Sequence, residues 1–161
     1  MILDALLQFS GTTNPTAGQS LAVGPSTVTS TNVIDLAGVG VGNTARDLGQ
    51  GNSLEIMIEV IQAFAGGTSM QVQLVCADDA GISVNVTTIV IDGAVPLANL
   101  TAGALLPLHW DRVAPFIARR YIALQYIILG TMTAGSVNSF VVTSVQDKGN
   151  NTLFNSGFSV S

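Results

Sequence analysis

Charged residues are scarce in this chain of 161 residues: they make up 9% of it, against about 25% in an average globular domain. Ten acidic side chains outnumber five basic ones, and the single lysine is Lys148. A protein that binds nucleic acid needs clustered lysine and arginine to neutralise phosphates. The one local cluster is Arg119-Arg120, with Arg112 seven residues earlier. The sequence therefore predicts no nucleic-acid partner.

Cysteine and histidine each occur once. The single cysteine, Cys76, excludes an intramolecular disulfide, and its apolar neighbours favour a buried thiol that packs as a small hydrophobe over a reactive one. The single histidine, His109, has Asp111 two residues away, but no nucleophile motif accompanies it. We interpret His109 as a partly buried structural residue, and a hydrolase that uses it is the weakest of three functional hypotheses.

Carboxylates occur in two places where they could do chemistry. Asp78-Asp79 precedes a glycine and could hold calcium, but the remaining spacing of a calcium loop is absent and a turn explains the pair equally well. Glu55 and Glu59 share one face of an expected strand, roughly 13 Å apart, which is too far for a glycosidase pair. The sequence thus predicts no metal, no cofactor and no catalytic residue.

The uncharged stretch from Tyr121 to Val142 is long enough to be considered as a membrane span. A membrane-spanning helix needs about 20 mostly apolar residues, but here the apolar run stops at Gly130 and residues 130–136 are rich in turn formers. Ile, Val and Tyr favour strands. We therefore predict two neighbouring strands with no membrane partner, and the first strand, apolar on both faces, should be covered on both sides.

Period-two alternation recurs along the chain, as in "SLEIMIEV" and "SMQVQLVC", and glycine-rich or aspartate-rich turns separate the runs. This pattern predicts an all-β jelly roll or β-sandwich of about eight strands. We divide the chain into an N-terminal arm over residues 1–31, a jelly-roll domain over 32–147 and a C-terminal tail over 148–161. Gly66-Gly67 predicts a hairpin turn.

Several segments, in order, resemble the jelly-roll capsid cement proteins of short-tailed bacteriophages, a family that includes the cement protein of a Bordetella phage. The segments are "MILDALLQFS", "STNVIDLAGVG", "ARDLGQGNSLEIMIEV", "RRYIALQYIILGTMTAG" and "VVTSVQ", and they extend from Met1 to about Gln146. The resemblance implies a structural virion protein, made in the bacterial host cytoplasm, on the outer capsid surface. It would bridge and stabilise subunits of the major capsid protein as a homodimer or homotrimer.

Residues that we expect to make assembly contacts lie mostly in the two ends of the chain. They are Ile2, Leu6, Phe9, Arg46, Asp47, Phe154 and Phe158. Charge depletion fits such a role, because charged residues are depleted at the core of protein interfaces. The alternative is a carbohydrate- or receptor-binding β-sandwich module of a virion, with exposed aromatic residues around Trp110 and Tyr121. An aromatic content of 6% counts against that alternative.

Overall fold

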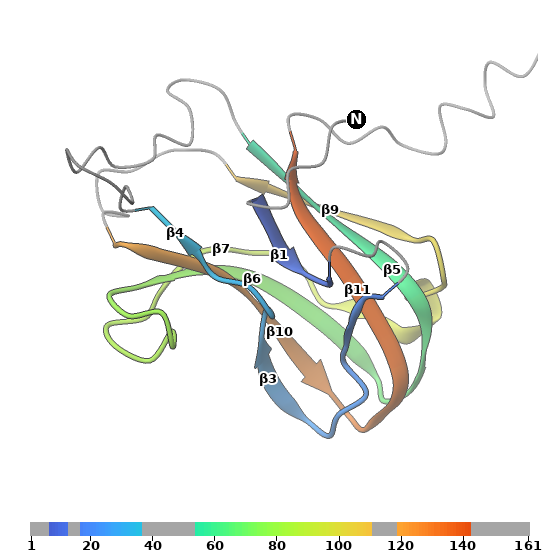
Figure 1. Cartoon of the computed structure of the whole chain (residues 1–161). Coiled ribbons are helices and arrows are strands. Elements are labelled where there is room, and N and C mark those ends of the chain that lie inside the picture. The colour runs from blue at the N-terminus through green and yellow to red at the C-terminus, as the bar shows by residue number, and fades with distance from the viewer. Residues whose placement is uncertain (1–6, 13–16, 37–53, 111–118, 143–161) are drawn as a thin grey trace, which may run out of the picture.

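Two antiparallel β-sheets pack face to face in the computed structural model, which describes residues 7–12, 17–36, 54–110 and 119–142 (Figure 1). Sheet A contains β1 (Gln8–Ser10), β2 (Gln19–Ser20), β5 (Leu54–Gly66), β9 (Leu105–Trp110) and β11 (Met132–Val142). Sheet B contains β3 (Ser26–Thr29), β4 (Ile34–Asp35), β6 (Ser69–Ala77), β7 (Thr87–Ile91), β8 (Val95–Pro96) and β10 (Tyr121–Leu129). A short 3-10 helix, η2 (Leu97–Asn99), follows β8. The predicted β-sandwich is confirmed.

The order of the strands is that of a jelly roll. Sheet A runs β1-β11-β5-β9 and sheet B runs β3-β10-β6-β7, so in each sheet a strand from the start of the chain pairs with a strand from its end, which in turn pairs with a strand from its middle. The described residues form eleven strands rather than about eight. The excess arises because β2 follows β1 along β11, β4 follows β3 along β10, and β8 follows β7 along β6. Eight strand positions are thus occupied, three of them by two short strands.

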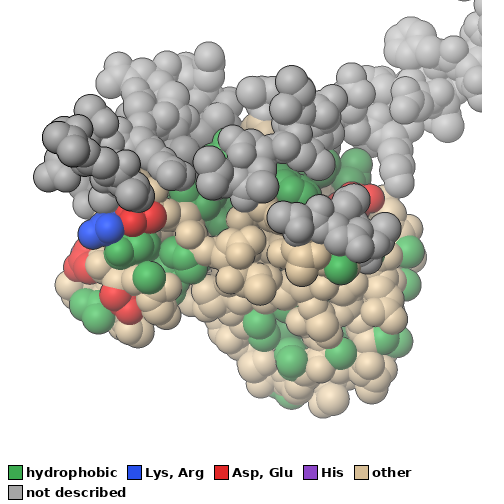
Figure 2. Space-filling view, viewed as in Figure 1, with side chains coloured by type: hydrophobic (Ala, Val, Ile, Leu, Met, Phe, Trp, Pro, Cys, Tyr) green, Lys and Arg blue, Asp and Glu red, His purple; other side chains and the backbone are tan. Residues whose placement is uncertain are grey.

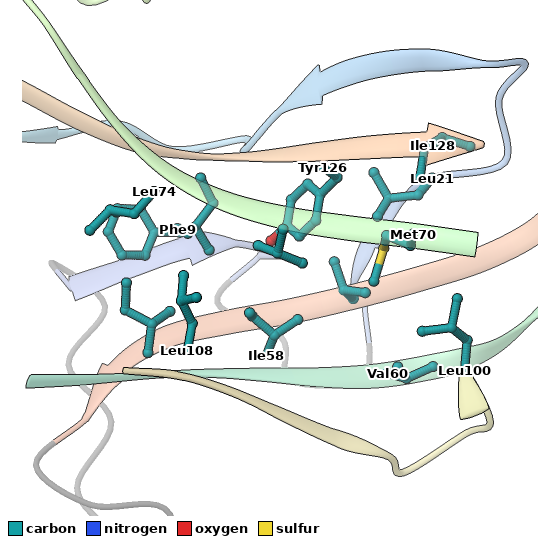
Figure 3. Packing of buried hydrophobic residues seen from close by; sticks show 14 of the residues in the cluster. Phe9, Leu21, Ile58, Val60, Met70, Leu74, Leu100, Leu108, Tyr126 and Ile128 are labelled. Carbon is teal, nitrogen blue, oxygen red and sulfur yellow. The ribbon is translucent and has the colours of Figure 1, made fainter. Parts of the chain in front are cut away.

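Alternation along the long strands explains the core. In β10 the residues Ile122, Leu124, Tyr126 and Ile128 face sheet A, and each is buried. In β5 the opposing set is Ile56, Ile58 and Val60. Figure 3 shows Tyr126 and Ile128 of β10 and Ile58 and Val60 of β5 meeting between the sheets, with Phe9, Met70, Leu74 and Leu108 among them. Burial of each such side chain contributes about 1.5–3 kcal/mol.

The uncharged run from Tyr121 to Val142 forms β10 and β11, joined at Gly130-Thr131. The two strands do not pair with each other, because β10 belongs to sheet B and β11 to sheet A. The same holds at Gly66-Gly67, so the predicted hairpin there is wrong: that turn carries the chain from one sheet to the other. In the described part of the chain, no helix has the length and apolar character needed to cross a membrane.

The described part of the expected N-terminal arm joins the sandwich. β1 pairs with β11, β3 pairs with β10, and Phe9 and Leu21 are fully buried. The boundary at residue 31 therefore does not separate an arm from the core. The sequence could not show this, because strands of two to four residues have no detectable period and owe their conformation to the long strands beside them.

Candidate assembly surface

His109 and Glu55 face each other on the outer side of sheet A. They pair across β9 and β5, with His109 Nδ1 3.3 Å from Glu55 Oε1, and the histidine side chain is 67% exposed. The expectation of a partly buried histidine is therefore wrong, because β9 is an edge strand and His109 points away from the core. Glu59 lies on the same face of β5, opposite Leu105.

Asp78 and Asp79 hold the loop between β6 and β7. Asp79 accepts hydrogen bonds from the backbone N–H groups of Val84 and Ser83, at 2.7 and 2.9 Å, and from the Ser83 hydroxyl at 2.8 Å. These donors, led by the Val84 N–H, lower the pKa of Asp79. The pKa of Asp78 is lowered by hydrogen bonds from Asn85 and then from Arg119. The pair thus shapes a turn, and the described residues contain no cluster of three metal-ligating side chains.

Cys76 is a core residue of β6. It is fully buried, and burial raises the pKa of its thiol. Its Sγ atom donates weakly to the backbone oxygen of Thr87, 3.6 Å away. The predicted role as a small buried hydrophobe is confirmed.

Of the expected assembly contacts, Phe9 alone lies in the described part of the chain, and its side chain is fully buried in the core. Phe9 is therefore not available to another subunit. It lies in β1, between Gln8 and Ser10. The other six, Ile2, Leu6, Arg46, Asp47, Phe154 and Phe158, lie outside the described residues.

Charged side chains gather at one end of the sandwich, which we call the loop end; there β4 and β6 finish and β10 begins. Arg120 donates from Nε and Nη2 to the two carboxylate oxygens of Asp35, at 2.9 and 2.8 Å, and this pairing raises the pKa of Arg120. The opposite end, which we call the turn end, holds the turns after β5 and β10. Its segments 17–29, 62–72, 93–105 and 126–138 contain no charged residue. Figure 2 shows acidic and basic side chains along the left and upper margins and none over the lower part.

The outer face of sheet B is uncharged away from the loop end. At the loop end Asp35 of β4 lies opposite Tyr121 and pairs with Arg120, whose guanidinium lies over the Tyr121 ring. Strands β3, β6, β7, β8 and β10 contain no Asp, Glu, Lys or Arg. Alternation and register place these residues on the face: Thr27, Thr29, Gln71, Gln73, Val75, Thr88, Ile91, Tyr121, Ala123, Gln125, Ile127 and Leu129.

A ladder of side-chain amides crosses the centre of this face. Gln73 Nε2 donates to Gln125 Oε1 at 2.8 Å, and the Thr88 hydroxyl donates to Gln73 Oε1 at 3.3 Å. Ile91 and Leu129, which flank the ladder, are 50% and 56% exposed. β10 is predicted to be covered on both sides. Its inner face is covered by sheet A. On its outer face Ala123 is also buried, because it packs with Val75 and the loop residue Ile82. The rest of the outer face is half-buried or exposed when only the described residues are considered.

Comparisons with known proteins bear on the family of the chain. A family model described as Bbp16 matches residues 16–141. The match covers both sheets from β2 through almost all of β11. A search of curated proteins found no match.

Proposed function

The chain belongs to the Bbp16 family, and on that premise we propose that it is a structural protein of a bacteriophage virion. The family name suggests a protein of a Bordetella phage. The described residues fold as a jelly roll. Its histidine and carboxylates form surface pairs or stabilise turns, and its cysteine lies in the core, so these groups do not form a shared reactive centre. More finely, the protein acts as a cement or decoration subunit on the outer capsid surface, without enzymatic activity, cofactor or metal.

The outer face of sheet B, which is uncharged away from the loop end, is the observation that carries this proposal. A face exposed to water in a monomer ordinarily mixes charges of both signs, which keep the protein dissolved. Charged residues are instead depleted at the core of interfaces, where desolvation of an unpaired charge is costly. Twelve outward residues without a charge, with half-exposed Ile91 and Leu129 among them, therefore fit a surface that another protein covers.

The partners that suit this face are the major capsid protein and further copies of the chain. The amides of Gln71, Gln73 and Gln125 carry both donors and acceptors, so they can bond backbone groups of a partner without a counter-charge. A cement subunit that contacts several capsid subunits in this way would hold them together against internal pressure.

No observation on the described residues favours the alternative function, a carbohydrate- or receptor-binding module of a virion. Phe9, Phe64, Tyr126 and Phe140 are buried, and the half-buried Tyr121 has the Arg120 guanidinium 4.9 Å above its ring. A sugar-binding site needs exposed aromatic faces on which a sugar ring stacks. The side chain of Trp110 is not among those described.

The test begins with purified particles. We expect the chain to be present in fixed stoichiometry with the major capsid protein, and particles that lack it should lose integrity on heating or at low salt. Absence from particles, or unchanged particle stability without it, would overturn the proposal.

A pair of variants tests the face itself. Ile127→Glu places a carboxylate on the outer face of sheet B, whereas Ala98→Glu places one on exposed η2, away from that face. We expect Ile127→Glu to reduce incorporation into particles by about tenfold or more, because a charge is desolvated when the face is covered. Ala98→Glu should be incorporated normally. Equal incorporation of both variants would show that another surface binds the capsid.

A further inference from the structure

Asp92 and Gly93 lie in the short connection between β7 and β8. They form the only Asp-Gly pair in the sequence, which has no Asn-Gly pair. Residues 92–94 are exposed and belong to no helix or strand. A Cβ atom added to Gly93 would meet nothing within 4 Å beyond its chain neighbours. Because glycine lacks that atom, the Gly93 nitrogen can approach the preceding side chain without steric hindrance.

The Asp92 carboxylate already lies against the nitrogen of the next peptide unit. The Gly93 N–H donates to Asp92 Oδ1 at 2.7 Å. The carboxyl carbon of Asp92, Cγ, is one bond from that oxygen. A small rotation therefore brings the Gly93 nitrogen to Cγ at the separation of about 3–3.5 Å from which reacting atoms combine.

The other aspartates in the described part of the chain, Asp35, Asp78 and Asp79, are held differently. Each is followed by a residue that carries a Cβ atom. Each carboxylate also accepts hydrogen bonds from groups beyond the next peptide unit; the donors belong to Arg120 for Asp35, to Asn85 and Arg119 for Asp78, and to Ser83 and Val84 for Asp79. The approach of nitrogen to carboxylate is thus particular to Asp92.

We propose that Asp92-Gly93 is a site of spontaneous conversion of aspartate to isoaspartate. The Gly93 nitrogen, as its proton passes to water, bonds to Cγ of Asp92, and the carboxyl hydroxyl leaves as water, which closes a succinimide ring. A water molecule then opens the ring. Attack at Cγ restores aspartate, whereas attack at the backbone carbonyl carbon of residue 92 leaves the chain running through Cγ, which is isoaspartate. The water lost is regained, so no other reactant is needed.

The hydrogen bonds that anchor Asp92 to β6 suit the product. The Asp92 N–H donates to the Val72 oxygen at 3.0 Å, and the Asp92 backbone oxygen accepts from Gln71 Nε2 at 2.8 Å. Both bonds can persist when the Gly93 nitrogen moves to Cγ, but the backbone oxygen then belongs to a carboxylate. Hydrogen bonds to charged acceptors are stronger than those to neutral ones. Gln71 is therefore a positioning residue that favours isoaspartate.

The connection also has room for a longer main chain. Ile91 pairs with Gln73 and Val95 pairs with Met70, so four residue steps from Ile91 to Val95 lie opposite three steps along β6. Isoaspartate adds one carbon atom to the main chain. A connection that already bulges can take up this atom without a change of register in β7 or β8, so the conversion proceeds in the folded chain.

The experiment is storage of the folded full-length chain in neutral buffer, followed over time by two readouts. Protein L-isoaspartyl methyltransferase transfers a labelled methyl group from S-adenosylmethionine to isoaspartate. Endoproteinase Asp-N cuts before aspartate but not before isoaspartate, so the bond after Ile91 should become resistant. Both signals should rise together without a lasting change of intact mass. Tandem mass spectrometry should place most of the isoaspartate at residue 92 and none at Asp79, the internal control.

Variants separate the chemistry from a loss of folding, which circular dichroism before storage checks. Asp92→Glu keeps the charge but needs a larger ring, so methylation at this position should be lost. Gly93→Ala should slow the reaction severalfold, because its Cβ atom hinders the nitrogen. Asp92→Asn should speed it severalfold, because an amide releases ammonia more readily than a carboxylate releases water.

A matched pair tests the role of Gln71. Gln71→Leu removes the amide that holds the Asp92 backbone oxygen, so the final ratio of isoaspartate to aspartate should fall. Gln73→Leu lies on the same face, but the Gln73 amide donates to Gln125 instead, so this variant should keep the wild-type ratio. An equal ratio in the two variants would overturn the role of Gln71.

Absence of isoaspartate at residue 92 from the stored wild type, or equal rates for the wild type and Gly93→Ala, would overturn the inference. Neither readout needs a particle, so both are independent of the proposed function. A chain that forms isoaspartate but is absent from particles contradicts the virion role alone. A chain that is incorporated into particles but keeps aspartate at residue 92 on storage contradicts the isoaspartate site alone.

Discussion

At the scale of single residues, the Tyr126 hydroxyl links the two sheets inside the core. It shares hydrogen bonds with Ser10 at 2.7 Å and Ser139 at 3.1 Å, and burial raises the pKa of Tyr126 to about 12. Ser10 and Ser139 face each other across β1 and β11, where the register shifts. The three hydroxyls therefore help to fix the register of β1 against β11, because a shift of β1 would leave buried hydroxyl oxygens without hydrogen-bond partners.

Tyr126→Phe should lower the free energy of unfolding by about 1–3 kcal/mol, since it leaves the hydroxyls of Ser10 and Ser139 short of a buried partner. Urea unfolding measures the loss. Tyr121→Phe is the control: Tyr121 is half-buried, its ring keeps the contact with Arg120 after the change, and the effect should stay within about 0.5 kcal/mol. Equal losses in the two variants would contradict a structural role for the hydroxyl network.

Asp79 should make the stability depend on pH in acid. Its pKa in the folded chain lies below the ordinary value of 3.8, so as pH falls the unfolded chain takes up the proton first. The stabilisation is complete above that ordinary value and is lost as pH falls through the folded-state pKa. Between about pH 5 and about pH 2 the free energy of unfolding, measured with urea, should therefore fall less for Asp79→Asn than for the wild type. Parallel losses would exclude Asp79 as a source.

Residue-level predictions from sequence succeed where the local pattern determines the environment. The alternating apolar run around Cys76 correctly indicates a buried thiol. The prediction for His109 fails because apolar neighbours along a strand do not tell which face a residue occupies or that β9 is an edge. The glutamine ladder of the outer face requires the pairing of β6 with β10, 52 residues apart between Gln73 and Gln125, and no local pattern reports that pairing.

At the scale of elements, the two turns that cross between the sheets pack against each other at the turn end. The Thr68 N–H donates to the Leu129 oxygen at 2.7 Å, and Gly130 has a positive φ of 79°. A Cβ atom on Gly130 would lie 2.8 Å from the Gly67 Cα atom. The turns can approach this closely only because both contain glycine.

Gly130→Ala should therefore lower the free energy of unfolding by at least about 1 kcal/mol, from the disfavoured φ together with a clash against backbone. Thermal unfolding measures this change. Gly24→Ala is the control, because a Cβ atom added to Gly24 would meet nothing within 4 Å beyond its chain neighbours, and it should leave the stability unchanged or raise it slightly. Comparable melting temperatures for the two variants would show that the close contact between the two turns does not contribute to stability.

The long strands are predictable from the sequence and the short ones are not. β5, β6, β10 and β11 are 9 to 13 residues long, enough for alternation and β-branched content to be recognised. The sequence also predicts correctly that the uncharged run is divided at Gly130, but the turn is confined to Gly130-Thr131, and residues 132–136, which are rich in turn formers, belong to β11. It cannot show that the strands on either side of each glycine turn belong to different sheets, because a tight turn has the same composition in both cases.

At the scale of the whole molecule, β1 determines what truncation does. The sequence by itself predicts that removal of residues 1–10 leaves the β-domain folded. Since Phe9 is buried and Gln8–Ser10 pair with β11, the structure instead leads us to expect that this deletion costs more than about 3 kcal/mol. Deletion of residues 1–6, which keeps β1, is the comparison, and chemical unfolding of both chains checks it. Equal stability would show that β1 contributes little.

The position of β10 and β11 in the sheets also bears on how the protein is made. Each is a central strand, β11 between β1 and β5 and β10 between β3 and β6, yet they are the last two strands of the described chain to leave the ribosome. During translation the earlier strands wait without their main partners, and pairing across such long sequence separations is slow. A nascent chain arrested before Tyr121 lacks the centre of both sheets. Folding is therefore deferred until β10 and β11 have been synthesised, and until then the earlier strands expose apolar surface that the complete sheets bury.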